Sequence, residues 1–355
     1  MNIFNAYIHH WYSIYKRDLP WRNTRDPYFI WLSEIILQQT RVDQGLAYYQ
    51  KFTEVFPTIS DLANASEDQV LKLWQGLGYY SRARNLHFTA KFITQQYYGK
   101  FPDKYHKLLL LKGIGEYTAA AIASISFNEE FPTVDGNVFR VLSRFFGIET
   151  PIDTTAGKKE FLELARELIK GTDPGMHNQA LMEFGALQCT PRKPNCLECP
   201  LNSQCYAFLT NKTDNLPVKM KKTKQRDRYF NYFVLLQDDY TWIRKRVEKD
   251  IWKNLFEFPM IETSTALSIE ELLSMPEVIQ LVNPDQSIVE KIEGWKIHLL
   301  THQKINYRII KVRLLQKNEM PNELIRVNKK DIFNFAVPKL LETHLKTNSK
   351  DELFT

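Results

Sequence analysis

The stretch at residues 108–140 constrains the chain more than any other. It contains an apolar run, a Gly-Ile-Gly turn at 113–115, an alanine-rich segment at 116–127, and then Asp135 at the start of another helical pattern. Alanine is the strongest helix former, so 116–127 is predicted to be a helix. Two glycines beside a helix N-terminus leave backbone N–H groups open to close approach, which favours binding of a phosphate.

Composition and charge set broad limits on the class of protein. The chain has 355 residues, which is enough for two or three domains, and a net charge of +6. The positive charge is concentrated at residues 211–228, which hold seven Lys or Arg against two Asp. A polyanionic partner and a solvated basic linker both fit this segment. Because no apolar run reaches ~20 residues and no cleavable signal is evident, we expect a soluble cytoplasmic protein with no membrane association.

Periodicity divides the chain into two parts. Up to about residue 208, apolar residues recur three and four positions apart, which predicts helices, and Ser66 with Gln69 forms a capping-box pattern. From residue 229 on, segments rich in aromatic and β-branched residues predict strands. The predicted strands are 229–236, 240–247 and 304–315, and the predicted short helices are 268–273 and 338–345. The sequence therefore predicts a mainly α N-terminal part followed by an α+β domain.

The four cysteines lie within seventeen residues, at Cys189, Cys196, Cys199 and Cys205. A secreted disulfide framework would scatter its cysteines through a smaller chain. A zinc site with four cysteines usually has two separate CxxC pairs, whereas only Cys196 and Cys199 form such a pair. One compact loop of four thiolates suits a [4Fe–4S] cluster better. We therefore predict such a cluster, with no iron position left open for catalysis.

Together these motifs resemble the endonuclease III superfamily of helix-hairpin-helix DNA glycosylases. LKGIGEYTAAAI resembles the hairpin, VDGNVFR the Asp loop that follows it, and the cysteine spacing the iron–sulfur loop. Within the superfamily, LPWR, WLSEIILQQTRV, GLGYYSRARNL and the additional C-terminal domain resemble the MutY family of adenine DNA glycosylases. The resemblance covers nearly the whole chain and is looser after residue 229.

The resemblance implies an overall function and a domain plan. The function is base excision repair, in which a monomeric enzyme hydrolyses the N-glycosidic bond of adenine opposite 8-oxoguanine or guanine in duplex DNA. Residues 1–210 would form the helical glycosylase region, with a six-helix barrel module and the iron–sulfur module. Residues 211–228 would be a basic linker, and residues 229–350 a Nudix-like domain that recognises 8-oxoguanine.

Breaking an N-glycosidic bond requires a proton for the leaving base and a negative charge near the sugar. Glu34 lies in an apolar helical segment, where burial would raise its pKa, although a solvent-facing glutamate is the simpler interpretation. Asp135 lies at a helix start, where N–H groups should lower its pKa, and it could serve only as an N-cap. The resemblance implies that Glu34 protonates adenine and that Asp135 stabilises the oxocarbenium-like sugar.

Tyr117 distinguishes two chemistries within the superfamily. Bifunctional members carry a lysine at this position, which acts as a Schiff-base nucleophile. A tyrosine cannot form a Schiff base, so the resemblance implies a monofunctional glycosylase in which Tyr117 and Asn137 position Asp135 and the sugar. Without the motif, a tyrosine on an alanine-rich helix would be read as core packing.

Access to a base in a duplex requires that the nucleotide be flipped out. The resemblance implies that Gln39 and Tyr79 fill the vacated stack. It also implies that Arg22 and Gln179 line the adenine pocket, although Gln179 could equally be a helix-surface residue.

The C-terminal part resembles a Nudix fold without the metal-binding box. Its first predicted helix has only the acidic pair Glu270-Glu271. Leu300-Thr301-His302 matches the loop through which the family recognises 8-oxoguanine, so the resemblance assigns that role to Thr301 and His302. Without the resemblance, His302 would be read as a surface residue.

Two other interpretations remain. A bifunctional glycosylase/lyase of the same fold is disfavoured by Tyr117 and by the additional domain. A non-catalytic, cluster-bearing DNA-binding module would lack Glu34 or Asp135, and both are present. In either case Gly113 and Gly115 would anchor the DNA backbone without reading its sequence.

Overall fold

The computed structural model consists of two compact units, residues 1–65 with 85–221 and residues 66–84 with 222–355. It describes residues 3–220, 225–316 and 320–347. Residues 66–84, which the sequence placed in the 1–210 region, thus belong to the second unit. They are held there by contacts such as those of Lys72 Nζ, which donates to the carbonyl oxygens of Phe333 at 2.6 Å and Phe335 at 3.1 Å.

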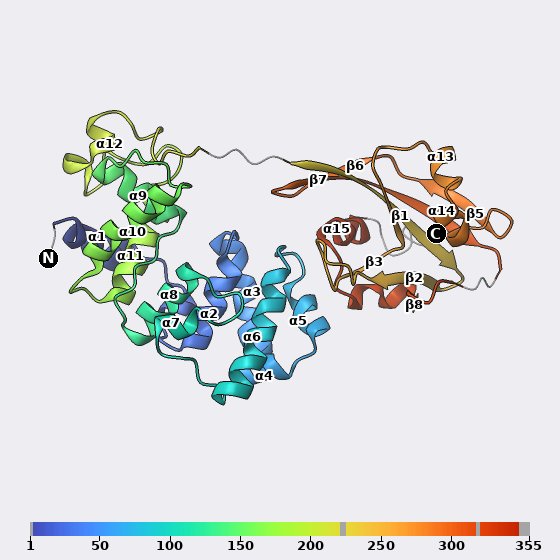
Figure 1. Ribbon diagram of the computed structural model, residues 1–355, viewed down its shortest axis with the longest axis horizontal. Helices are drawn as coiled ribbons and strands as arrows, with labels where there is room; N and C mark the ends of the chain where they lie inside the picture. Colours follow the sequence, from blue (N-terminus) through green and yellow to red (C-terminus); the bar gives the residue numbers. More distant parts are fainter. Residues whose placement is uncertain (1–2, 221–224, 317–319, 348–355) are drawn as a thin grey trace. The chain divides into compact units, whose positions relative to one another are not determined.

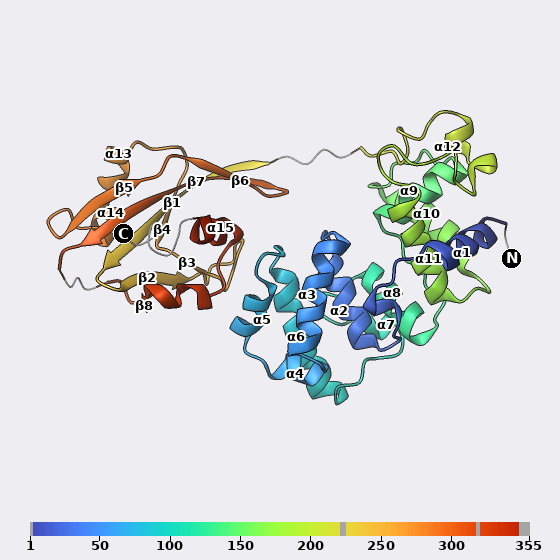
Figure 2. The same cartoon turned by 180° about the vertical axis from the view of Figure 1, so that it is seen from behind.

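The first unit is helical, as Figures 1 and 2 show from opposite sides. Its elements are α1 (Ile3–Tyr15), η1 (Pro20–Arg22), α2 (Pro27–Leu37), α3 (Val42–Val55), α4 (Ile59–Asn64), most of α6 (Ser81–Tyr97), α7 (Tyr105–Leu108), α8 (Glu116–Phe127), α9 (Gly136–Phe146), α10 (Thr155–Ile169), α11 (Pro174–Leu187), η2 (Asn202–Gln204) and α12 (Tyr206–Leu209). The predicted helix at 116–127 is confirmed as α8. It ends at Asn128, which adopts the left-handed conformation that often terminates helices.

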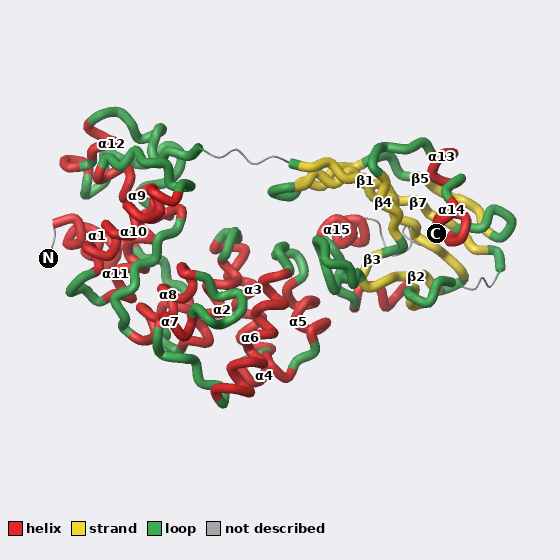
Figure 3. Tube along the Cα trace, in the orientation of Figure 1, coloured by secondary structure: helices red, strands yellow, loops and turns green. Residues whose placement is uncertain are grey.

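The second unit contains the sheet, as the strand colouring of Figure 3 makes clear. Its elements are α5 (Glu67–Trp74), the start of α6, β1 (Arg226–Gln237), β2 (Tyr240–Lys245), β3 (Phe256–Glu257), β4 (Met260–Thr263), α13 (Ile269–Leu273), α14 (Pro276–Leu281), β5 (Ser287–Ile292), β6 (Lys296–Leu299), β7 (Gln303–Leu314), β8 (Leu324–Asn328), η3 (Lys329–Asn334) and α15 (Lys339–Thr347). The predicted strands and short helices of this part correspond to β1, β2, β7, α13 and α15. The capping box at Ser66 and Gln69 is confirmed at the start of α5.

Strand β1 is the centre of the sheet. The order is β3-β2-β1-β7-β5, with β4 also paired to β1, β6 to β7 and β8 to β2. β1 and β7 run parallel, while the other pairs are antiparallel. Residues 230–236 of β1 are buried without interruption, which is typical of a strand covered on both faces. One face packs on α13 and α14 through a shared apolar core.

The predicted basic linker is divided between the two units where it is described. Midway along it, the Met220 N–H donates to Asp153 Oδ1 at 3.1 Å, so this part packs on the first unit. At its end, β1 already begins at Arg226, and Arg228 is buried in ion pairs instead of being exposed to solvent. Lys221, Lys222 and Lys224 of the predicted linker lie outside the described residues.

Helix α11 packs closely on α9 because of a glycine. A Cβ at Gly185 would lie 2.7 Å from Asn137 Cβ and 2.9 Å from the Asn137 carbonyl oxygen. Only glycine permits this approach. The close packing brings the side chains of α11 to the start of α9, which carries Asp135. No helix in the described part of the chain combines the length and apolarity needed to cross a bilayer.

Candidate active site

A pocket in the first unit collects side chains from five helices and from the segment around η1. Its walls come from α2, the start of α3, α8, the start of α9 and α11. Six residues that the sequence predicted at separate positions line it: Glu34, Asp135, Tyr117, Asn137, Arg22 and Gln179. The fold therefore brings the predicted catalytic and base-binding residues into one site.

Glu34 reaches this pocket from α2. The helix begins at Asp26, whose carboxylate accepts the N–H of Tyr28 at 2.8 Å, with a proline in the first turn. Burial raises the pKa of Glu34 to about 7, a hydrogen bond with Tyr117 opposes the rise, and the charge of Asp135 adds to it. The direction of the shift agrees with the prediction. A carboxyl group with this pKa holds a proton in a large fraction of molecules near neutral pH.

Asp135 is the N-cap of α9. Its Oδ1 accepts the N–H groups of Asn137 at 2.9 Å and Val138 at 2.8 Å, and its Oδ2 accepts from Asn137 Nδ2 at 2.8 Å. The predicted direction of its pKa shift is wrong: burial raises the pKa of Asp135, and this outweighs the lowering by the hydrogen bonds and by Arg140. The N-cap position was visible in the sequence, whereas the desolvation depends on helices that are distant along the chain.

Tyr117 lies between the two carboxylates and α11. Its hydroxyl is 3.1 Å from Met182 Sδ and is also hydrogen-bonded to Glu34. Burial, together with the charges of Glu34 and Asp135, raises the pKa of Tyr117 well above its usual value, so the side chain is a neutral phenol. Core packing alone, the alternative interpretation of Tyr117, does not explain this position beside both carboxylates.

Glu183 and Arg17 are pocket residues that the sequence interpretation missed. The carboxylate of Glu183 accepts from Arg22 at 2.8 and 2.6 Å and from the Arg17 side chain at 2.9 and 2.6 Å. Burial alone would raise the pKa of Glu183, but these hydrogen bonds lower it to about 2. The signal in the sequence was spacing: Glu183 follows Gln179 by four residues, so both share one helix face. Gln179 itself accepts from the Tyr12 hydroxyl at 2.9 Å.

Helix α9 connects the pocket to the cysteine loop. Arg140 Nη2 donates to Asn137 Oδ1 at 2.9 Å, and its Nε donates to the Cys189 carbonyl oxygen at 2.7 Å. One turn later, Arg144 Nη1 lies 3.4 Å from Cys189 Sγ. A displacement of the loop would therefore reach the side chains that hold Asp135.

The cysteine loop has the surroundings of a site for an anionic thiolate cluster. Burial raises the pKa of Cys199 to about 12, and the other three thiols add to the rise, so the four thiols interact with one another. The backbone N–H of Leu201 donates to Cys199, and those of Phe208 and Ala207 donate to Cys205. Such N–H donors and the guanidinium of Arg144 offset the charge of a thiolate-bound iron–sulfur cluster. The residues present fit the predicted cofactor.

The Gly-Ile-Gly turn joins α7 to α8, as expected for a hairpin. Gly113 has a φ of +81°, and a Cβ there would meet the Asn85 side chain at 2.7 Å, so the fold itself requires glycine at this position. Gly115 is the N-cap of α8, and a Cβ there would meet no atom within 4 Å. The fold therefore does not require glycine at Gly115, where the missing side chain leaves the first N–H groups of α8 accessible.

The two residues predicted to fill a vacated base stack lie outside this pocket. Gln39 follows α2 with a φ of +57°, and Tyr79 has a φ of +48° and is 46% exposed. A left-handed backbone costs a non-glycine residue free energy and is often found at functional positions. Both residues are thus presented outward on loops.

A second pocket lies within the second unit. Tyr79, Thr301 and His302 all line it, together with residues of the 250–252 loop and of β6. The hydroxyl groups of Tyr79 and Thr301 are hydrogen-bonded to each other. The residue predicted to fill the stack and the residues predicted to recognise the lesion therefore share one pocket. In α13, the carboxylate of Glu271 accepts the backbone N–H of Ser268 and so caps its own helix.

Three family models match the chain in succession. The HhH-GPD superfamily base excision DNA repair protein model matches residues 32–169, the iron–sulfur binding domain of endonuclease III matches 189–205, and a NUDIX domain matches 231–347. The predicted fold class is confirmed, and so is the [4Fe–4S] cofactor; the matched iron–sulfur domain runs from Cys189 to Cys205, and the four cysteines within it are the residues that would hold the cluster. When bound, this cluster supplies a crosslink among four thiolates within one loop.

Removing one ligand should release the cluster and destabilise the first unit. We expect Cys199→Ser to give a protein with less iron and a weaker brown colour than the wild type, and a lower Tm, because metal binding contributes to folding free energy. Ser203→Ala, at an exposed position of the same loop, is the matched control and should retain both iron and Tm. Iron analysis and thermal unfolding check this result, and full iron content in Cys199→Ser would contradict the assignment.

Two curated relatives align with this chain over different lengths. The adenine DNA glycosylase of Buchnera aphidicola (subspecies Acyrthosiphon pisum, strain APS) is 32% identical over 356 residues, 99% of each chain. The adenine DNA glycosylase of Homo sapiens is 43% identical over 213 residues, which cover 58% of this chain and 39% of the human one.

Solved structures show the same fold for the helical part. A thermostable thymine-DNA glycosylase has a TM-score of 0.55 at 32% identity and covers 59% of this chain and 96% of its own. A non-covalent endonuclease III–DNA complex has a TM-score of 0.50 at 20% identity with the same coverage. The pocket, the cluster loop and the relative that agrees over the full length together show that this chain is a DNA-binding DNA glycosylase that belongs to the family of adenine DNA glycosylases.

Proposed function

We propose that the protein is a monofunctional glycosylase that removes adenine paired with 8-oxoguanine or guanine in duplex DNA. The observation that carries the proposal is that Glu34, with a pKa of about 7, and Asp135 line the same pocket. Two carboxyl groups with different surroundings are what an acid and a charge stabiliser require.

Glu34 is the general acid in this proposal. A protonated carboxyl group in the pocket can donate its proton to a ring nitrogen of adenine, which makes the base a better leaving group. The hydrogen bond between Tyr117 and Glu34 fixes the direction of the carboxyl group. A pKa near the working pH allows the group both to hold the proton and to release it.

Asp135 stabilises the positive charge that develops on the sugar. Its carboxylate accepts three hydrogen bonds from the first turn of α9, which fix its orientation and favour its charged form. Because the carboxylate is already held in place, it does not have to reorient as the glycosidic bond breaks. Water then completes the reaction, because Tyr117 replaces the lysine with which a bifunctional enzyme would form a Schiff base.

The polar groups of the pocket suit a purine edge. Adenine offers an amino donor beside ring-nitrogen acceptors. Gln179 and Arg22 line the pocket, and the amide group of Gln179 can meet this edge. Glu183 is 1% exposed, and its oxygens already accept five hydrogen bonds from Arg17 and Arg22, so its role is to hold these arginines in place beside the base.

Binding to the duplex uses residues outside the catalytic pocket. Gly113 and Gly115 present backbone N–H groups to a phosphate, while Gln39 and Tyr79 fill the space left by the flipped nucleotide. Thr301 and His302, which share a pocket with Tyr79, recognise 8-oxoguanine opposite the adenine.

The test is single-turnover cleavage of three duplexes, with adenine opposite 8-oxoguanine, adenine opposite guanine, and thymine glycol. We expect fast release of adenine opposite 8-oxoguanine, slower release opposite guanine and no reaction of thymine glycol, with strand scission only after alkali. Scission without alkali would identify a lyase and overturn the monofunctional assignment. Absence of base release from all three duplexes would support a non-catalytic DNA-binding module instead.

A further inference from the structure

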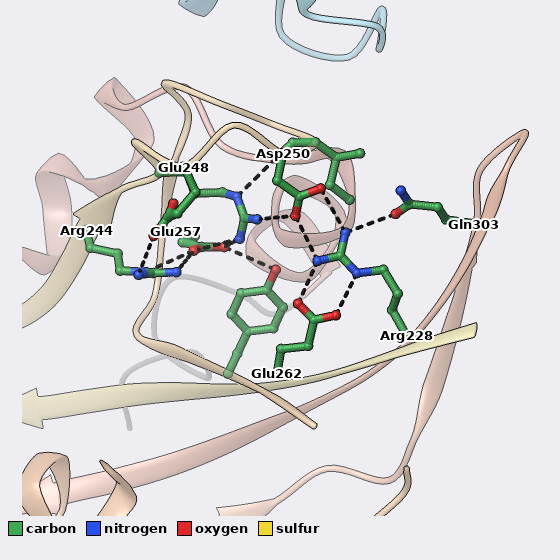
Figure 4. Close-up of polar contacts among 10 residues, drawn as sticks. Arg228, Arg244, Glu248, Asp250, Glu257, Glu262 and Gln303 are labelled. Atoms are coloured by element: carbon green, nitrogen blue, oxygen red, sulfur yellow. Dashed lines mark hydrogen bonds and ion pairs between the residues drawn. The ribbon is translucent and has the colours of Figure 1, made fainter. Parts of the chain in front are cut away.

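A buried charge cluster lies behind the second pocket, within the second unit. Figure 4 labels Arg228 of β1, Arg244 of β2 and the acids Glu248, Asp250, Glu257 and Glu262. Arg246, which follows β2 directly, belongs to the same cluster because it donates to both carboxylate oxygens of Glu257 at 2.9 Å. The arginine side chains are between 3% and 19% exposed. Fixed charges at this depth persist only when each is paired.

Arg228 uses all five of its N–H donors. Nε donates to Glu262 at 2.7 Å, and the terminal nitrogens donate to Glu262 at 2.6 Å, to Asp250 at 2.7 and 3.1 Å, and to Gln303 Oε1 at 3.1 Å. The guanidinium is planar with a fixed fork of donors, so it sets the relative positions of its three partners. A lysine has three donors on a point charge and could not hold the same set.

Two of these partners belong to different walls of the second pocket. Asp250 lies on the 246–255 loop next to Ile251 and Trp252, and all three residues line the pocket. Gln303 follows Thr301 and His302 directly and also lines it. The Arg228 side chain therefore joins the two walls from behind.

Each wall depends on contacts from outside its own segment. The 246–255 loop contains Trp252 with a φ of +59° and Asn254 with a φ of +67°, strained conformations for residues other than glycine that persist only when the surroundings impose them. The 300–303 turn is held by β1 and the residue before it: Gln225 Nε2 donates to the Leu300 carbonyl oxygen at 3.0 Å and Arg226 N–H to that of His302 at 3.0 Å.

We propose that Arg228 is a specificity-determining positioning residue, which sets the spacing between the Asp250–Trp252 wall and the Thr301–His302 wall and so the preference for the base opposite adenine. The inference rests on the proposed role of Thr301 and His302. Arg228 has no place in the catalytic pocket, so its effect falls on discrimination. In the sequence it had looked like one more charge of a basic linker.

Arg244 provides a matched control. It belongs to the same cluster and pairs with Glu257 and Glu248, neither of which lines the pocket. Loss of Arg244 removes a comparable charge but leaves the hydrogen bonds that link the two pocket walls in place. Any general effect of disturbing the cluster should therefore appear in both variants, while an effect on spacing should appear only at Arg228.

The experiment compares single-turnover rate constants for adenine opposite 8-oxoguanine and opposite guanine in full-length, cluster-loaded protein. We expect Arg228→Gln to reduce the ratio of these constants about tenfold, in the range of couplings between residues in one hydrogen-bond network, and Arg228→Lys to reduce it nearly as much. Arg244→Gln should leave the ratio unchanged. Gln303→Ala should reduce the ratio, and adding it to Arg228→Gln should cause little further loss, because both variants cut the same link.

Thermal unfolding identifies any variant that does not fold, in which case Gln303→Ala, which leaves the buried ion pairs intact, carries the test. An unchanged ratio in both Arg228→Gln and Gln303→Ala would overturn the inference, as would an equal reduction in Arg244→Gln. A Thr301→Ala/His302→Ala variant separates the proposed recognition of 8-oxoguanine from the proposed positioning role of Arg228. If it lowers the ratio while the Arg228 and Gln303 variants do not, the proposed recognition site stands and the positioning role fails. If the wild type shows no preference for 8-oxoguanine, the proposed function fails first.

Discussion

Glu34→Gln is expected to lower single-turnover release of adenine by about 10²- to 10⁴-fold, the usual contribution of a general acid. Glutamine has nearly the same shape and can still hydrogen-bond to Tyr117, but it has no acidic proton to transfer. Binding of the uncleaved duplex should remain close to that of the wild type. Glu163→Gln, at a side chain that is 60% exposed on α10, is the control and should leave the rate unchanged. Turnover at the wild-type rate in Glu34→Gln would remove Glu34 from the acid role.

The same residue sets an expected pH dependence. Because the protonated form is the active acid and its pKa is about 7, the rate constant should fall above pH 7 and reach roughly a tenth of its plateau at pH 8. Stability follows the same titration. Between the usual pKa of 4.5 and the folded value of about 7, the folded state holds the proton that the unfolded state has lost. The free energy of unfolding therefore decreases as pH rises through this window.

Glu34→Gln should remove this loss of stability. At pH 8 the variant is expected to be more stable than the wild type by at most about 3 kcal/mol, while near pH 4 the two should be similar. Denaturant unfolding at the two pH values measures the difference. Equal stability at both values would mean that the folded protein does not resist ionisation of Glu34.

Asp135→Asn is expected to reduce the rate by about 10²- to 10³-fold, the usual effect of removing one oriented electrostatic group from an active site. Asparagine is as good an N-cap as aspartate, so the start of α9 should persist and Tm should change little. The substitution therefore separates the charge of Asp135 from its role as a helix cap.

A matched N-cap control is available in the same unit. Asp26 caps α2 through the N–H of Tyr28 and does not line the pocket, so Asp26→Asn should leave the rate unchanged. Asp135→Ala, which loses both charge and cap, should be inactive and also less stable by about 1 kcal/mol. A loss of only a few-fold in Asp135→Asn would make Asp135 a structural N-cap.

Local features were predictable because their causes are local. The α8 helix follows from its alanine-rich composition, and the turn before it follows from Gly113, whose left-handed backbone a side chain would strain. The position of Asp135 at a helix start and the compact cysteine loop likewise depend on neighbours in the sequence. The strands of the second unit were evident from β-branched and aromatic residues.

Features that depend on desolvation or on distant partners were harder to predict from the sequence. The helix start suggested a lowered pKa for Asp135, yet burial against other helices raises it. Only the four-residue spacing from Gln179 pointed to Glu183, because its partners Arg17 and Arg22 are more than 160 residues away. Arg228 lies in a segment with the composition of a basic linker, but in the structure it is part of the sheet and pairs with Glu262 and Asp250.

The sequence by itself determined the helical hairpin and the compact iron–sulfur loop, because each is a property of residue type and short spacing. The predicted cluster ligands and the monofunctional chemistry predicted from Tyr117 rest on the same local properties. Tertiary structure alone decided that α2, α8, α9 and α11 bring Glu34, Tyr117, Asp135 and Glu183 into one pocket. The close packing of α11 on α9 at Gly185 is the physical reason for part of that convergence. The 108–140 stretch supplies the hairpin and Asp135, but the acid and the base-binding groups come together with it only through the packing of distant helices, which excludes water around them.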